Sequence, residues 1–310
     1  MSAQLKHRIR VPAPIADVRE ALTEPAALRV WFAEHAEVRP PDRYEFWGRH
    51  TPEGDVPRQR LLQLDDHTVR FQWRLDDTDT TVEVRLTDEG PASTVVTLTQ
   101  TDLPGFDEMI VEASTLGQLH TFWALSLANL VDFVEGRELT PKCDFTAPEM
   151  RAEVTIDAPP VAVWSSLTDP EQFAEWFGAR IAIEPRVGGR WAMGDFDIDP
   201  SPAKIIELDP ASRMALAWDD GLVTTWELAE SAGQTRLTIV QSGFGPERPP
   251  YGAWMGWLGG LSELRRYHEM ADWRPSWLEV QLNGAPQGIL AIGTQDSTLE
   301  DVRRSTANRG

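Results

Sequence analysis

An internal repeat constrains the fold of this 310-residue sequence more than any other feature. Residues 13–32 read APIADVREALTEPAALRVWF, and residues 158–177, which lie 145 positions later, read APPVAVWSSLTDPEQFAEWF. The same register repeats an Ala-Pro, a Thr-acid-Pro and a Trp-Phe, a coincidence that chance seldom produces. With small drifts at loops the match continues to residues 123–133, which align with residues 257–267 at a shift of 134. We therefore expect two tandem copies of one domain, which also fits a chain about twice the usual domain length.

The boundaries of the copies follow from composition. A polar segment, EGRELTPKCDFTAPE, separates them and contains two prolines and a glycine, as interdomain linkers commonly do. We expect a first domain at 1–140, a linker at 141–149, a second domain at 150–280 and a partly disordered C-terminal tail at 281–310. Within the tail, the segment GILAIGT could add a strand or contact a partner.

Each copy shows the same order of local signals. A strand at about 5–11, and again at 151–157, stops at Ala-Pro, because proline lacks the donor that a strand needs and begins a helix well. The Thr-acid-Pro motif then ends one short helix and begins another, with the Thr or the acid as the cap. Roughly six strands with one apolar face follow, in the order of an antiparallel meander.

A long helix closes each copy. In the first copy its apolar stripe contains Leu116, His120, Trp123, Leu127 and Leu130 at spacings of three and four residues. A curved antiparallel sheet with a long helix across its concave face is the economical arrangement of these elements. The sequence thus predicts an α+β chain of two tandem domains.

This order of elements resembles the helix-grip, or START-like (SRPBCC), superfamily. Within that superfamily, the GGRW at 188–191, the IIELDPASRMALAW at 205–218 and the WLGGLSEL at 257–264 resemble bacterial homologues of the heat-shock protein 90 ATPase activator. The resemblance implies a hydrophobic pocket between sheet and long helix in each domain, but no single reaction. The first copy has PDR at 41–43 in place of GGR, so the two copies need not share a function.

Candidate ligand-binding residues follow from projecting the alternating strand positions and the helix stripe inward. They are Tyr44, Phe46, Phe71, Trp73, His120 and Trp123 in the first copy, and Trp191, Met193, Trp218, Trp226, Trp254 and Trp257 in the second. Aromatic faces suit a flat apolar ligand, although the same tryptophans could simply fill the cores. His120 is the single candidate for proton transfer, with a hydrogen-bonded core histidine as the alternative.

Several function classes are disfavoured by composition. Acidic residues exceed basic ones by 49 to 29, for a net charge of −20, so we expect neither nucleic acid nor an anionic membrane surface as a partner. There is no 18-residue apolar run and no apolar secretion signal at the N-terminus, which favours a cytoplasmic location. One cysteine and six scattered histidines predict no metal, and the nucleotide-binding glycine motifs are missing, so no cofactor is expected.

Three functions remain. The first is a non-enzymatic binding protein for a small hydrophobic ligand of aromatic, lipid or polyketide-like character, held in an internal cavity. The second is an enzyme of the aromatase/cyclase kind, in which a polar group such as His120 assists proton transfer in the cavity. The third, implied by the name of the related family, is a chaperone-accessory or protein-interaction module whose acidic surface docks a protein partner.

Overall fold

The computed structural model describes residues 3–103 and 115–282. The first copy forms β1 (Ala3–Val11), α1 (Ile15–Thr23), α2 (Pro25–Trp31), β2 (His35–Arg39), β3 (Arg43–Trp47), β4 (Gln59–Leu64), β5 (Thr68–Leu75), β6 (Thr78–Gly90), β7 (Ser93–Leu103) and α4 (Thr115–Val134). The second forms β8 (Met150–Ile156), α5 (Pro160–Thr168), α6 (Pro170–Phe177), β9 (Ile181–Ile183), β10 (Arg190–Met193), β11 (Ala203–Asp209), β12 (Arg213–Ala217), β13 (Val223–Ser231), β14 (Gln234–Ser242), α7 (Tyr251–Glu269) and β15 (Trp277–Leu282). The expected α+β order of elements is confirmed in both copies.

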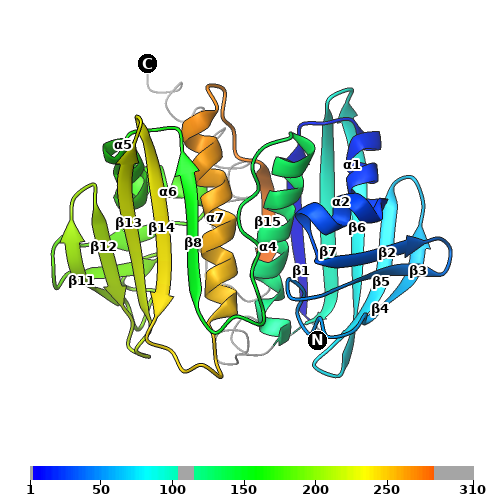
Figure 1. Cartoon of the computed structure of the whole chain (residues 1–310), viewed down its shortest axis with the longest axis horizontal. Coiled ribbons are helices and arrows are strands. Elements are labelled where there is room, and N and C mark those ends of the chain that lie inside the picture. Colours follow the sequence, from blue (N-terminus) through cyan, green and yellow to red (C-terminus); the bar gives the residue numbers. More distant parts are fainter. Residues whose placement is uncertain (1–2, 104–114, 283–310) are drawn as a thin grey trace, which may run out of the picture.

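The strands pair as antiparallel meanders, and the first strand of each copy pairs with the last strand of its own meander, β1 with β7 and β8 with β14. The second sheet has the order β8-β14-β13-β12-β11-β10-β9, and the first runs β1-β7-β6-β5-β4 with β2 and β3 as a separate hairpin. The long helices α4 and α7 lie side by side between the two sheets (Figure 1). Two helix-grip units therefore meet through their long helices.

The repeated Trp-Phe motif has a structural cause. The Trp31 indole Nε1 donates a hydrogen bond to the Ala21 carbonyl at 2.9 Å, and the Trp176 indole does the same to the Ser166 carbonyl at 2.8 Å. Both bonds are buried and join the second short helix to the end of the first. A buried indole N–H needs a partner, so this bond explains why both copies keep a tryptophan at that spacing.

The repeated Ala-Pro is held in a similar way. The Thr94 hydroxyl donates to the carbonyl of Ala13 at 2.8 Å, and the Thr235 hydroxyl donates to the carbonyl of Ala158 at 2.6 Å. Each bond links the start of the last meander strand to the end of the first strand. These carbonyls would otherwise be buried without a partner, which is costly.

The expected helix caps are only partly correct. In α6 the Asp169 carboxylate accepts two backbone N–H groups of the first turn, whereas Glu24 before α2 makes no side-chain cap. Glutamate is one methylene longer than the short side chains that cap well. Neither threonine caps the following helix, because the hydroxyls of Thr23 and Thr168 donate back to carbonyls four residues earlier.

The strand β15 crosses from the second copy to the sheet of the first. It pairs antiparallel with β1, with Leu5 opposite Leu282 and His7 opposite Val280. Lys6 Nζ contributes an ion pair to Glu279 at 2.9 Å. The boundary expected at 280/281 falls inside this strand, and the GILAIGT segment lies outside the described residues.

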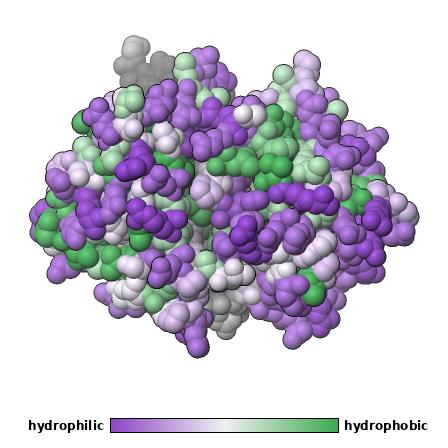
Figure 2. All heavy atoms as spheres, in the orientation of Figure 1, coloured by the Kyte–Doolittle hydropathy of each residue, from purple (hydrophilic) through white to green (hydrophobic). Residues whose placement is uncertain are grey.

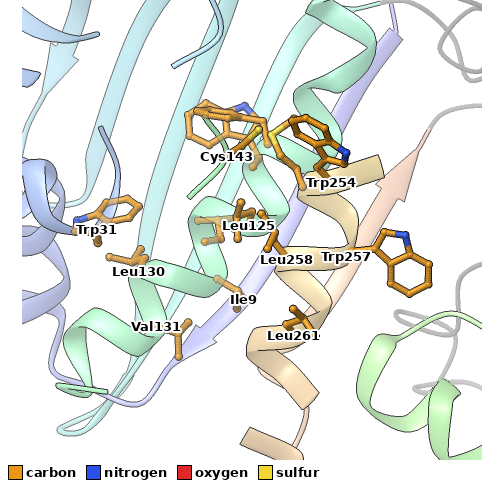
Figure 3. Packing of buried hydrophobic residues seen from close by; sticks show 14 of the residues in the cluster. Ile9, Trp31, Leu125, Leu130, Val131, Cys143, Trp254, Trp257, Leu258 and Leu261 are labelled. Carbon is orange, nitrogen blue, oxygen red and sulfur yellow. The ribbon is translucent and has the colours of Figure 1, made fainter. Parts of the chain in front are cut away.

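Equivalent positions of the two long helices meet each other. A Cβ at Gly252 would lie 3.6 Å from Gln118 Cγ, and a Cβ at Gly259 would lie 3.4 Å from the Leu125 backbone nitrogen. The members of each pair are 134 positions apart, which is the shift of the sequence repeat in this region. The helices therefore pack about a pseudo-twofold axis, as in an isologous dimer. Figure 3 shows Leu125 and Leu258 at this contact.

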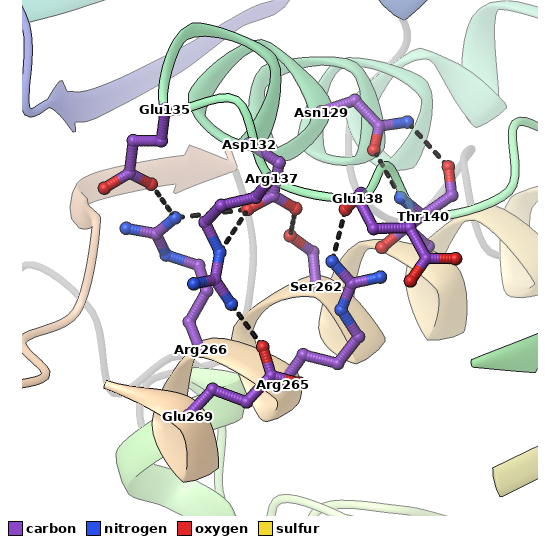
Figure 4. Close-up of polar contacts among 10 residues, drawn as sticks. All are labelled: Asn129, Asp132, Glu135, Arg137, Glu138, Thr140, Ser262, Arg265, Arg266 and Glu269. Atoms are coloured by element: carbon purple, nitrogen blue, oxygen red, sulfur yellow. Dashed lines mark hydrogen bonds and ion pairs between the residues drawn. The ribbon is translucent and has the colours of Figure 1, made fainter. Parts of the chain in front are cut away.

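A polar network joins the C-terminal halves of the two helices (Figure 4). Asp132, which is fully buried, accepts hydrogen bonds from Ser262 Oγ at 2.6 Å and from Arg266 Nη1 at 3.1 Å. Arg137 Nη2 bonds Glu269 at 2.5 Å. These charged bonds fix the relative position of α4 and α7.

The molecular face in Figure 2 is mostly hydrophilic, with hydrophobic residues in small groups. Within the described part of the chain, no helix has the length and apolar character needed to span a membrane.

Candidate functional site

A cavity of about 450 Å³ lies within the second domain and reaches the first. Its walls come from α6, α7 and the second sheet, and from α4, β1 and β15 on the side of the first domain. Besides small residues, its lining includes His7, His120, Thr121, Trp176, Phe177, Trp191, Met193, Trp218, Asp220, Leu222, Gln241, Trp257, Glu263, Trp277 and Val280. The volume falls within the range of small-molecule sites.

The structure brings five of the candidate residues to this cavity: His120, Trp191, Met193, Trp218 and Trp257. The Trp191 ring contacts those of Trp218 and Trp257, with centroids 5.7 and 5.9 Å apart. In Figure 3 Trp257 points away from the contact between the two helices. An aromatic wall of this kind offers a flat apolar surface with few polar groups.

Two candidates of the second domain do not line the cavity. Trp226 lies behind Trp257, with ring centroids 4.9 Å apart in an edge-to-face contact. Trp254 of α7 is buried, and its ring contacts those of Tyr251 and Phe244, with centroids 5.1 and 5.6 Å apart. Trp226 therefore supports the cavity wall by packing, and Trp254 supports the helix that carries part of that wall.

The candidates of the first domain, apart from His120, form a packed core. They are Tyr44, Phe46, Phe71, Trp73 and Trp123, each at most 4% exposed. The Trp73 ring contacts Phe46, Phe122 and Trp123 with centroids 5.1, 5.6 and 5.9 Å apart. Alternation correctly predicts that these side chains point inward, but it cannot distinguish a filled interior from an open one.

One pair of equivalent positions explains much of this difference. Phe122 of α4 fills the first domain, where it contacts Phe32, Trp73 and Trp123. Its counterpart 134 positions later is Gly256, which lines the cavity with no side chain at all. A Cβ at Gly256 would meet only Thr121 Cγ2 of α4, at 3.5 Å, so the absence of a ring at this position leaves space beside α7.

Two histidines lie on the first-domain side of the cavity. The imidazoles of His7 and His120 stack with centroids 4.8 Å apart, and Trp277 of β15 lies 5.5 Å from His7. Burial lowers the pKa of His120 to about 4 and that of His7 well below its usual value, so both rings are neutral at pH 7. The apolar neighbours Leu5 and Ile9, two residues either side of His7, are the sequence signal that could have identified it.

Glu263 of α7 is a further buried titratable group, 3% exposed. Burial raises its pKa to about 7, although Arg266 and the side chains of Ser276 and Trp273 act in the opposite direction. It falls on the helix stripe beside Leu264 and looks like an ordinary surface residue in the sequence. Its placement depends on the docking of the first domain and β15, which the repeat alone does not predict.

Six buried polar atoms of residues that line the cavity have no hydrogen-bond partner: Nδ1 and Nε2 of His7, Nδ1 of His120, Nε1 of Trp191, Oε1 of Gln241 and Oε2 of Glu263. The side chains of Trp191 and Gln241 are 0% and 2% exposed. Across residues 3–103 and 115–282, no cluster of three or more His, Cys, Asp or Glu side chains is arranged to hold a metal ion.

These observations define a class: a tandem helix-grip protein in which the described core of the first domain is closely packed and the second domain borders an aromatic cavity. The chain belongs to the family described as "Activator of Hsp90 ATPase homolog 1-like protein", whose model matches residues 12–135 and 157–269. The resemblance seen in the sequence motifs is thereby confirmed for both copies.

Solved structures include several similar chains. A Mesorhizobium loti protein is 26% identical over 40% of this chain and 99% of its own, with a TM-score of 0.35. An AHSA1-like protein from Aeromonas hydrophila is 24% identical over 39% of this chain and 94% of its own, with a TM-score of 0.33. DynU16, a putative protein in the dynemicin biosynthetic locus, is 17% identical over 86% of this chain and 99% of its own, with a TM-score of 0.37. A search of curated proteins finds no significant match.

Proposed function

We propose that this chain binds a small, largely apolar aromatic molecule in the cavity of its second domain, as a cytoplasmic binding protein. The observation that carries the proposal is the aromatic cavity of about 450 Å³ in a domain whose duplicate is filled. Packing of the first domain shows that this fold can close its interior with side chains. An open interior in the second copy is therefore a feature of its own sequence, centred on Gly256.

The first domain acts as a scaffold in this proposal. Its helix α4 supplies His120, Thr121 and Ala124 to the cavity, and β15 adds Trp277 and Val280 from its sheet. A site formed by both domains explains why the chain keeps a copy with a filled core. The fixed helix contact also pre-organises the site, which lowers the entropy lost on binding.

The binding test uses N-phenyl-1-naphthylamine, a neutral probe that fluoresces in apolar surroundings. Ala253 lines the cavity from an exposed position of α7, so Ala253→Trp places an indole at the cavity with little effect on folding. We expect Ala253→Trp to weaken probe binding at least about tenfold. Val161→Trp is the control, because Val161 is 71% exposed on α5 and does not line the cavity.

Native mass spectrometry of the freshly purified protein adds an independent reading. A stoichiometric apolar compound retained by the wild type and lost from Ala253→Trp supports the proposal. An empty protein that also fails to bind the probe contradicts it. Equal binding by the wild type and both variants would place the probe elsewhere and contradict it too.

Proton-transfer chemistry in the same cavity is the second candidate, and Glu263 favours it. A pKa of about 7 suits a general acid or base at neutral pH. His120, with its pKa near 4, is a weak base there. Glu263→Gln separates the two candidates. If the protein is an enzyme, the variant should lose turnover of the bound compound. If it is a binding protein, the variant should keep its affinity for the neutral probe.

A further inference from the structure

One hydrogen-bonded trio of the first domain is complete. In β7, Gln100 Nε2 donates to Thr80 Oγ1 at 2.8 Å, and Gln100 Oε1 accepts from Trp123 Nε1 at 2.6 Å. All three side chains are at most 4% exposed. Because the Thr80 hydroxyl itself donates to the Trp73 carbonyl at 2.8 Å, the threonine must accept from the amide, and the orientation of the glutamine is fixed.

The same trio is broken in the second domain. Gln241 Nε2 still donates to Thr224 Oγ1 at 2.9 Å. Trp257, the counterpart of Trp123, instead packs against Trp226, Phe177 and Trp191. Gln241 Oε1 is left without a partner in a side chain that is 2% exposed and lines the cavity. A buried acceptor without a partner is destabilising, so a ligand that brings a hydrogen-bond donor to this oxygen is favoured.

A buried donor without a partner also belongs to a residue that lines the cavity. Trp191 Nε1 lacks a partner in a fully buried ring that lines the cavity. The charged groups of the lining are acidic, Asp220 and Glu263, and no Lys or Arg is among the described lining residues. A carboxylate or phosphate placed here would be desolvated without a counter-charge, whereas a neutral hydroxyl satisfies the wall.

We infer that the ligand is an uncharged hydroxylated aromatic molecule of the phenol class, whose O–H donates to Gln241 Oε1 while an oxygen of the ligand accepts from Trp191 Nε1. This inference rests on the proposed binding function and makes Gln241 its specificity residue. It separates neutral phenols from fatty acids and other anionic lipids. It also gives a role to the different packing of Trp257 and Trp123. Because the Trp257 indole does not donate to Gln241 Oε1, that oxygen is available to a ligand.

The test is calorimetric titration of the full chain with four probes of one shape. They are 2-naphthol, 2-methoxynaphthalene, 2-methylnaphthalene and 2-naphthoate. Gln241→Met removes the acceptor while keeping an unbranched side chain of similar length. Gln100→Met removes the equivalent glutamine of the first domain, outside the cavity, and controls for a lost Gln–Thr bond.

For the wild type we expect 2-naphthol to bind at least about tenfold more tightly than 2-naphthoate. The preference for 2-naphthol over 2-methylnaphthalene should fall about tenfold in Gln241→Met and stay unchanged in Gln100→Met. Comparing ratios removes the difference in hydration of the probes. Should Gln241→Met misfold, two other measurements test the contribution of the ligand O–H. One is the same ratio in Gln241→Leu, and the other is whether the wild type prefers 2-naphthol to 2-methoxynaphthalene, which has an acceptor but no donor.

The outcomes separate the two proposals. If the uncharged probes bind but the ratio is the same in Gln241→Met, the cavity binds ligands and the inference is overturned. A wild-type preference for 2-methoxynaphthalene or for 2-naphthoate also overturns it. If no probe binds to the wild type, the proposed function fails together with the inference.

Discussion

At the scale of single residues, two glycines of α7 are present for different structural reasons. A Cβ at Gly256 would lie 3.5 Å from Thr121 Cγ2, an ordinary contact, and this residue sits in mid-helix. A Cβ at Gly260 would lie 2.6 Å from the ring of Phe177 and 3.2 Å from that of Trp176. Gly256 leaves space for the cavity, whereas Gly260 is required by the close packing of α6.

We therefore expect alanine to have opposite effects at these two positions. Gly256→Ala should raise the urea midpoint, because alanine favours a helix interior by up to about 1 kcal/mol over glycine. Gly260→Ala should lower the urea midpoint, because overpacking reduces the free energy of unfolding by about 1–3 kcal/mol. It should also weaken probe binding, because the ring of Phe177 must move. Each variant is the control for the other, and equal shifts would show that the glycines act through helix propensity alone.

The stacked histidines predict a dependence of stability on acid. Their pKa values are lowered in the folded protein, to about 4 for His120, so the unfolded chain binds protons more readily. Stability is therefore full above about pH 6.5 and falls as the pH drops toward 4. His120→Phe keeps a ring beside His7 and should remove up to ~3 kcal/mol of this loss.

The measurement is the urea midpoint at pH 7.0 and at pH 4.5. His67→Phe, at an exposed position of a turn, controls for the removal of a histidine. A drop in midpoint that is the same for the wild type and His120→Phe would rule out the neutral imidazole as its source.

At the scale of elements, the contact of α4 with α7 shows what a tandem repeat permits and a homodimer does not. Asp132 and Arg266 are equivalent positions, 134 residues apart, and they form a buried ion pair. In a symmetric pair of identical copies this position would face itself, so two aspartates or two arginines would repel each other. Covalent linkage lets the two copies carry opposite charges at the axis.

Breaking this pair should destabilise the interface strongly. In Asp132→Ala, Arg266 keeps Glu135 but loses its fully buried partner, and removal of one member of a buried pair typically destabilises by about 3–5 kcal/mol. Arg266→Met alone leaves Asp132 buried with Ser262 and Arg137. The double variant should be more stable than the sum of the single changes predicts. A double-mutant cycle of urea midpoints measures this, and additive effects would argue against coupling.

The sequence predicts most of the elements and less of the site, for a physical reason. Periodicity and proline placement report on one copy at a time, so they correctly indicate the meander, the short helices and the inward direction of Trp73 or Trp191. The cavity depends on contacts between copies. His7 and Trp277 join it only because the long helices dock and β15 pairs with β1, and no local pattern encodes that arrangement.

The alternation of apolar and polar residues along a strand also cannot show whether the interior of a domain is filled. Phe122 and Gly256 occupy equivalent helix positions, and only the packed structure shows that the ring of Phe122 packs into the core of its domain while Gly256 lines a cavity.

At the scale of the whole molecule, β15 ties the second domain to the sheet of the first and forms part of the cavity wall. Trp277 and Val280 line the cavity from this strand, Lys6 pairs with Glu279, and Arg10 N–H donates to the Ser276 carbonyl at 2.7 Å. The strand thus links ligand binding to the docking of the two domains. Removing it should affect both properties together.

A chain ending at residue 276 should therefore lose probe affinity at least about tenfold and unfold at lower urea concentration than the full chain. A chain ending at residue 282 keeps β15 and is the matched control, because both lack residues 283–310. Without β15, an edge of β1 is unpaired and the ring of His7 loses the Trp277 contact, so the site opens on the side of the first domain. Equal affinity in the two truncated chains would mean that the second domain encloses its ligand alone, and that β15 serves stability only.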